Sequence, residues 1–178
     1  MEYNFTLKYQ LADSDNDHDD VVERLGANGC DDALIGIGIP GRIALMFARE
    51  ADSAHGAIVS ALADIRRAAP DARLIEATPD FVGLTDVAEA VGVSRQNMRK
   101  LMTTYPASFP LPVHEGSASV WHLADVLRWL AQRGSYDLDP ALVDVAEVTM
   151  QVNLARSATR LVPEIRDRKS TRLNSSHG

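Results

Sequence analysis

The chain has 178 residues, of which 46% are hydrophobic, and a formal net charge of −7. This composition provides for one or two compact domains, and no apolar run approaches the ~20 residues that span a bilayer. Nothing after Met1 resembles a secretory signal peptide, and the single cysteine, Cys30, cannot form an internal disulfide, so we expect a cytoplasmic protein.

Residues 1–80 predict a small α+β unit with the element order strand, helix, strand, strand, helix, strand. Its apolar positions are, in chain order, Tyr3, Phe5, Leu7, Tyr9 and Leu11; Val21, Val22 and Leu25; Ile35, Ile37 and Ile39; Ile43, Leu45 and Phe47; Ala54, Ile58, Ala61, Leu62 and Ile65; and the segment 73–78. This order is that of a ferredoxin-like βαββαβ domain. Such a sheet has helices on one face only, so its other face must be covered by a partner, a neighbouring domain or water. We predict that this face mediates dimerisation; the alternative role of the unit is sensing.

Two sites that this half suggests are not supported. Asp13–Asp20 is acidic, but a calcium loop starting at Asp13 needs glycine and glutamate where the chain has His18 and Arg24. Gly36, Gly38 and Gly41 match the letters of a dinucleotide fingerprint, yet the chain continues with the period of a strand instead of a helix. We therefore predict a solvated acidic loop and a hairpin over 33–50.

Residues 84–133 predict two short helices, a hairpin and a third helix. Thr85 is expected to cap the first helix, Gly92 to form the turn, and Ser94 to cap the second helix, which runs from Arg95 to about Thr104. Prolines 106, 110 and 112 hold the following chain extended, Val113–Trp121 predicts a hairpin around Gly116, and the third helix ends at Gly134.

The second of these helices carries the residue types that bind nucleic acids. Met98, Leu101 and Met102 occupy its apolar side, whereas its polar side has Arg95, Gln96, Asn97, Arg99, Lys100 and Thr103. Arginine pairs with guanine, glutamine and asparagine pair with adenine, and lysine contacts phosphate. Residues 1–80 carry 7 basic and 15 acidic side chains, but 94–105 contain three basic residues and no acidic one. The locally basic stretch thus coincides with this helix.

The segments LTDVAEAVGVSRQNMRKLM, FPLPV, the Gly-centred hairpin, VW and LADVLRWLAQRG resemble, in this order, the winged-helix domain shared by MerR-type regulators and excisionase or AlpA-like phage proteins. The resemblance covers about fifty residues. It implies that the second helix enters the major groove of DNA and that the hairpin, the wing, contacts flanking phosphates. Glu115, and the lack of lysine or arginine in the wing, departs from this pattern.

Carried over to this chain, the resemblance implies base contacts from Arg95, Gln96, Asn97 and Arg99, and phosphate contacts from Lys100, His114, Ser117 and Ser119. With the two expected cap residues, Thr85 and Ser94, the predicted DNA-binding residues number ten. Trp121 and Trp129 are expected to be core residues. The five histidines show no metal-ligand spacing and no nucleophile has a plausible base, so we expect no catalytic site, cofactor or metal.

Beyond the winged helix, Asp139 and Pro140 predict the start of a helix that ends near Arg156 and packs against its own domain or contacts a second chain. Asp167–His177 (DRKSTRLNSSH) resembles a translated sequencing adapter, so the natural C-terminus is expected to lie beyond about residue 166.

The expected fold class is α+β: a ferredoxin-like unit over 1–80, a winged helix-turn-helix over 81–134, a C-terminal helix over 135–166 and an artefactual disordered tail over 167–178. The expected function is sequence-specific binding of double-stranded DNA by a homodimeric bacterial transcriptional regulator, not an enzyme. The alternatives are an antitoxin or excisionase-like architectural protein, and a protein-interaction adaptor whose winged helix does not bind DNA.

Overall fold

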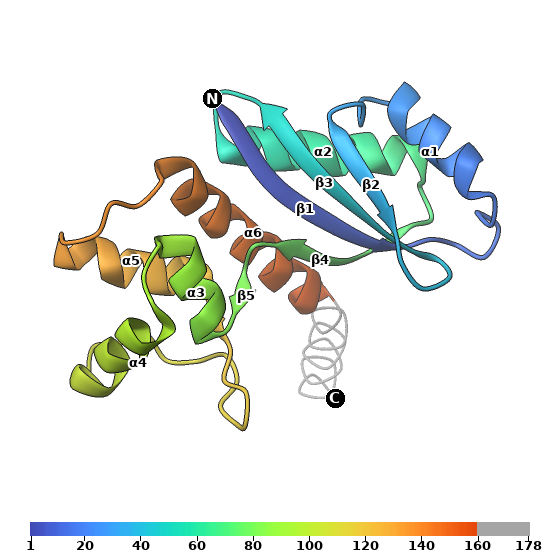
Figure 1. The fold of residues 1–178 in the computed structure, drawn as a ribbon. Helices are drawn as coiled ribbons and strands as arrows, with labels where there is room; N and C mark the ends of the chain where they lie inside the picture. The colour runs from blue at the N-terminus through green and yellow to red at the C-terminus, as the bar shows by residue number, and fades with distance from the viewer. Residues whose placement is uncertain (160–178) are drawn as a thin grey trace, which may run out of the picture.

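Apolar and polar residues alternate along the first strand, β1 (Glu2–Gln10), and the apolar ones are buried on one side of a sheet. The computed structural model describes residues 1–159 and shows β1 inside a four-stranded sheet (Figure 1). The strand order is β2–β3–β1–β4, with β2 Ala33–Ile37, β3 Arg42–Glu50 and β4 Arg73–Thr78. Every neighbouring pair is antiparallel.

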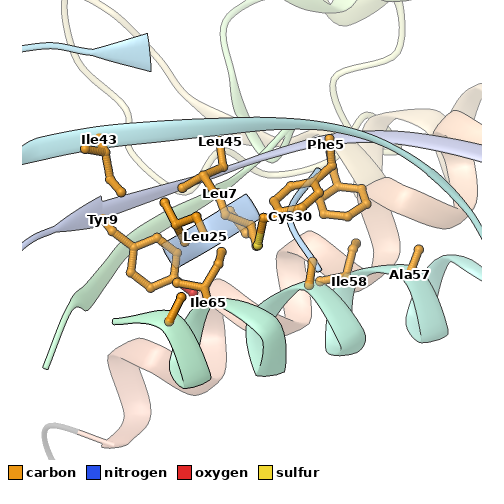
Figure 2. Packing of buried hydrophobic residues seen from close by; sticks show 14 of the residues in the cluster. Phe5, Leu7, Tyr9, Leu25, Cys30, Ile43, Leu45, Ala57, Ile58 and Ile65 are labelled. Atoms are coloured by element: carbon orange, nitrogen blue, oxygen red, sulfur yellow. The ribbon is translucent and has the colours of Figure 1, made fainter. Parts of the chain in front are cut away.

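Two helices cover one face of this sheet, α1 (His18–Ala27) and α2 (Ala54–Ala68). Each begins at a capping side chain: Asp17 accepts a hydrogen bond from the amide of Asp20, and Ser53 accepts one from the amide of Gly56. Figure 2 shows the shared core, where side chains of β1 and β3 meet α2. Because Cys30 is buried in this core, the pKa of its thiol is raised to about 11. The predicted order strand, helix, strand, strand, helix, strand is confirmed.

A buried arginine in β3 forms several polar contacts at one end of this core. Arg49 in β3 forms a bidentate pair with Asp32, at 2.7 and 2.9 Å, and a further ion pair with Asp64 at 2.9 Å. It also donates to Ser60 Oγ and to the carbonyl of Gly29. These partners raise the pKa of Arg49, and the hydrogen bond from Arg49 lowers the pKa of Asp32. The cluster ties β3 to α2 and to the loop before β2.

The second group of elements follows at once: β5 (Phe81–Val82), α3 (Leu84–Val91), α4 (Arg95–Thr104), β6 (Trp121–His122) and α5 (Leu123–Arg133). Its core combines Val87, Met98, Trp121, Leu127 and Leu130. β5 pairs with β6, a pairing that the sequence analysis did not anticipate because both strands are only two residues long. Trp121 and Trp129 are 4% and 8% exposed, which confirms that they are core residues.

The long helix α6 (Pro140–Thr159) lies between the two groups (Figure 1). Asp139 caps its start by accepting a hydrogen bond from the amide of Ala141. Val145 belongs to the core under the sheet, whereas the adjacent Ala146 belongs to the core of the second group. The expectation that this helix packs against its own domain is therefore too narrow, because it packs against both.

Buried polar groups join α6 to the connection between β4 and β5. The Asp80 side chain, fully buried, lies 2.7 Å from His122 Nδ1 and accepts a hydrogen bond of 2.9 Å from Asn153 Nδ2. Thr149 donates to the carbonyl of Pro79 at 2.6 Å. Since these contacts come from α6 and β6, they fix the connection that links the sheet to the second group.

The two rejected sites also have the expected structure. Residues 11–17 form a loop ahead of α1, and β2 and β3 form a hairpin whose turn includes Gly41 at φ 81°. A left-handed φ of this kind favours glycine. The segments expected beyond residue 159, including the adapter-like 167–177, lie outside the described residues.

Candidate nucleic-acid interface

The corner between α3 and α4 positions the candidate site. Gly92 ends α3 with φ 78°, and its amide donates to the carbonyl of Ala88. Ser94 Oγ then accepts a hydrogen bond of 3.1 Å from the amide of Asn97 and starts α4. Met98 is fully buried and belongs to the core that also contains residues of α3 and α5. The predicted turn at Gly92 and the predicted cap at Ser94 are confirmed.

The cap predicted at the start of α3 is wrong by two residues. Helix α3 begins at Leu84, and Gly83 precedes it without a capping side chain. Asp86 takes over the role, because its Oδ2 accepts a hydrogen bond of 3.0 Å from the amide of Gly83. Thr85 is an exposed residue of the first turn, so its hydroxyl is not used as a cap.

The outer side of α4 is polar and exposed. Its members are Arg95, Gln96, Asn97, Arg99, Lys100 and Thr103. Among the ion pairs of residues 1–159, none includes Arg95, Arg99 or Lys100. Thr103 differs, since its hydroxyl donates to carbonyls of its own helix. The cationic side chains are therefore available to an external partner.

The segment after α4 is held by aromatic packing. Phe109 is 5% exposed and packs edge-on against Trp129, with ring centroids 5.1 Å apart. Trp121 Nε1 donates to the carbonyl of Pro110 at 3.0 Å. At the end of α4, the guanidinium of Arg133 lies over the ring of Tyr105 at 4.0 Å. These contacts fix both ends of the segment between α4 and the wing.

The wing is a loop closed by a single β-bridge. His114 pairs with Val120, and the amide of Val113 donates to the carbonyl of Val120 at 2.7 Å. The predicted hairpin over 113–121 is thus confined to its base, because Trp121 pairs with Val82 instead. His114 and Ser117 are exposed, and Ser119 is partly exposed.

A groove of about 660 Å³ separates α4 from the wing. Five of the ten predicted site residues line it: Thr85, Arg95, Arg99, Ser117 and Ser119. The other five, Ser94, Gln96, Asn97, Lys100 and His114, are not among its lining residues. The structure thus brings the two arginines of α4 together with the hydroxyls of the wing.

The same groove contains two carboxylates, Asp86 and Glu115. Sequence analysis identified Glu115 as a departure in the wing, whereas Asp86 lies in a distant part of the sequence, in the first turn of α3. Its place in the same groove as Arg95 and Arg99 follows from the fold of 83–86 against the wing. The negative charge of the two carboxylates, Asp86 and Glu115, opposes phosphate binding at this point of the groove.

A second hollow, of about 740 Å³, lies where the sheet meets the connection to the second group of elements. Leu34, Met46 and Phe81 line it, and they are 71%, 47% and 43% exposed. The face of the sheet opposite α1 and α2 is therefore partly bordered by the neighbouring residues 78–82.

In the described part of the chain, no group of three or more His, Cys, Asp or Glu side chains is arranged to hold a metal ion. Over the same residues, none of the helices combines the length and apolar character required to cross a membrane. Comparison with protein-family models, with curated proteins and with solved structures gives no match to this chain.

Proposed function

We propose that this chain binds double-stranded DNA in a sequence-specific manner, with α4 in the major groove, and acts in the bacterial cytoplasm as a transcriptional regulator. The observation that carries the proposal is the outer side of α4, where Arg95, Arg99 and Lys100 are exposed and outside the ion pairs of residues 1–159. An exposed guanidinium that is not paired within the protein retains its capacity for bidentate bonds to guanine.

The arrangement around α4 supports the assignment of roles. Gln96 and Asn97 lie in the first turn of α4 and are exposed, where they would meet adenine edges. Lys100 lies further along the helix and would contact phosphate. The amides and hydroxyls of Ser117 and Ser119 would contact the backbone across the groove. In this proposal 81–134 is a winged helix-turn-helix.

The proposal assigns the N-terminal unit to assembly. The strand order β2–β3–β1–β4 and its two helices support a ferredoxin-like unit. A homodimer would present two copies of α4 to two half-sites of a palindromic operator. No small-molecule cofactor is part of the proposal, which describes a binding protein and not an enzyme.

One observation favours a different function, that of a protein-interaction adaptor. Leu111, which lines the groove, is 84% exposed, and Val113 is 51% exposed. Glu115 follows them in the wing. Exposed apolar residues next to a carboxylate suit a protein surface better than a phosphate backbone. Under this alternative the winged group holds a protein ligand and does not bind DNA.

Enrichment from a random pool of double-stranded DNA tests the two functions against each other. The full chain is expected to select a discrete site, which it binds at least about 10³-fold more tightly than non-specific DNA. Selection of no site, with weak salt-sensitive binding or none, would contradict regulation and favour the adaptor. A selected site beside a toxin gene or a recombination site would instead indicate an antitoxin or an excisionase-like protein.

A further inference from the structure

The two edges of the four-stranded sheet differ in whether their backbone groups have hydrogen-bond partners. At β4, helix α6 occupies the edge: the Asn153 side chain exchanges hydrogen bonds with the amide and carbonyl of Ala77, at 2.9 and 2.8 Å, and Arg156 donates to the carbonyl of Leu74 at 2.7 Å. At β2, on the far side of the sheet from α6, no strand within residues 1–159 pairs with the outer edge (Figure 1).

The hydrogen bonds of the hairpin identify the backbone groups at the outer edge. The carbonyl of Asp32 accepts from the amide of Ala48, and the amide of Gly38 donates to the carbonyl of Arg42, so both residues face β3. Bonding alternates along an antiparallel strand, so residues of the other parity face outwards. The amides and carbonyls of Ile35 and Ile37 are therefore directed away from β3.

The side chains along the β2 edge are of types that permit pairing with another strand. From Ala33 to Ile39 the chain contains no charged residue, and Leu34, Ile37 and Ile39 are 71%, 49% and 62% exposed. Edge strands of soluble proteins are commonly protected by lysine, proline or a bulge. The β2 edge has no such protection before Pro40, which favours an extended strand as its partner.

Two glycines in this segment have no evident role in the single chain. Neither Gly36 nor Gly38 has a positive φ. A Cβ built on Gly36 comes within 4.0 Å only of the carbonyl oxygen of Ala44, and one on Gly38 has no neighbour within 4 Å. Glycine weakens a strand and often marks the close approach of another backbone.

We propose that β2 pairs in antiparallel fashion with β2 of a second copy of this chain, with Gly36 on the two-fold axis. In this register Ile35 lies opposite the partner's Ile37, so the outward amides and carbonyls of both residues are bonded. Leu34 lies opposite the partner's Gly38, which leaves room for its exposed side chain. The partner is a second copy because the segment fits itself in this register. It carries no charges that would repel each other, and its two glycines lie where the partner's Gly36 and Leu34 approach.

This edge differs from the sheet face that the sequence analysis assigned to dimerisation. The face opposite α1 and α2 carries Lys8, Arg42 and Glu76. Burying it against a second copy would remove these charges from water, which costs free energy unless they are paired. Pairing through β2 leaves them solvated. The proposal is also independent of DNA binding, since no residue of α4 or the wing takes part.

Amide exchange measured by nuclear magnetic resonance on the full chain tests the pairing directly. The amides of Ile35 and Ile37 should gain protection as the protein concentration rises through the dimer dissociation constant. The amides of Leu34 and Gly36, which face β3, are the internal control and should be protected throughout. Fast exchange of Ile35 and Ile37 at all concentrations would overturn the proposal, and so would protection that does not depend on concentration.

A charge-swap experiment tests the position of the axis. In a dimer of Gly36→Lys or of Gly36→Glu, two like charges face each other across the axis. We therefore expect the dissociation constant of the dimer, measured by sedimentation, to rise at least about tenfold in each variant alone. An equimolar mixture of the two should recover the dimer, because opposite charges then face each other. Recovery excludes misfolding as the cause of the loss.

Met46→Lys is the matched control, because it places a charge on the open face of the sheet and away from the edge. It should leave the dimer unchanged. A dimer that is lost in Met46→Lys and retained in both Gly36 variants would overturn the proposal in favour of the face.

Discussion

The side-chain amide of Asn153 pairs with the backbone of Ala77 as a neighbouring strand would. Its Oδ1 accepts from the amide at 2.9 Å and its Nδ2 donates to the carbonyl at 2.8 Å. The same Nδ2 donates to the buried carboxylate of Asp80 at 2.9 Å. One side chain of α6 thereby satisfies three buried polar groups around the connection between the two cores.

Asn153→Ala should consequently destabilise the protein more than the loss of its few side-chain atoms suggests. The substitution leaves the amide and carbonyl of Ala77 and one oxygen of Asp80 without their partner, so we expect a loss of about 2–4 kcal/mol in the free energy of unfolding. Urea unfolding followed by circular dichroism measures it. Leu154→Ala is the control, because Leu154 is 52% exposed on the same helix and should change stability by less than about 0.5 kcal/mol. Equal losses in the two variants would show that water replaces Asn153.

Arg99→Ala should reduce the affinity for the selected DNA site by about 1–3 kcal/mol and relax the preference at one base position. The reason is that Arg99 is exposed on α4 and lines the groove towards the wing. Fluorescence anisotropy with the selected site and its single-base variants measures both effects. Lys8→Ala removes the same charge from the sheet and should leave the affinity unchanged. An unaltered base preference in Arg99→Ala would contradict a direct contact between Arg99 and a base.

Glu115→Lys should strengthen DNA binding. The wing has no lysine or arginine, and Glu115 contributes negative charge to the groove that contains Arg95 and Arg99. One new phosphate contact should steepen the dependence of log affinity on log salt by about 1. Titrations at several salt concentrations measure this slope. Glu23→Lys on α1 makes the same change in net charge far from α4, so an equal effect in both variants would indicate a general charge effect and not a wing contact.

Acid should weaken the tie between β3 and the loop before β2. The hydrogen bond from Arg49 lowers the pKa of Asp32, so the folded chain holds its carboxylate ionised to lower pH than the unfolded chain does. The resulting stabilisation is complete above the unfolded pKa of about 3.9 and is lost as the pH falls through the lower, folded pKa. Urea midpoints measured from pH 7 to pH 3 should fall less steeply in Asp32→Asn than in the unmodified chain. Parallel curves would contradict a stabilising role for the ionised pair.

The periodic parts of the fold could be predicted from the sequence, since burial on one side leaves a direct pattern. The alternation in β1 and β3, the caps at Ser94 and Asp139, and the turn at Gly92 are all local features, and all are confirmed. The pairing of β5 with β6 joins residues that are about forty positions apart, and two-residue strands carry no periodicity. It could not be read from the sequence.

Helix α6 shows a different limit of sequence reasoning. Its apolar residues lie on two sides, because Val145, Val148 and Val152 pack under the sheet while Ala146 and Met150 pack against the second group of elements. A single apolar stripe is the usual signal for a surface helix, and two stripes obscure it. For the candidate site, the polar side of α4 was predictable from spacing, whereas the presence of Asp86 in the same groove as Arg95 and Arg99 depends on the tertiary fold.

The closure of the β4 edge by Asn153 and Arg156 also limits how far this protein can polymerise. A sheet with two open edges can add copies without end, as in fibrils. Here only the β2 edge of this sheet remains open within residues 1–159. In the proposed dimer a second copy would use the one available edge of each chain and leave none for a third. If the chain pairs as proposed, the helix that joins the two cores would confine growth through this sheet to a closed pair.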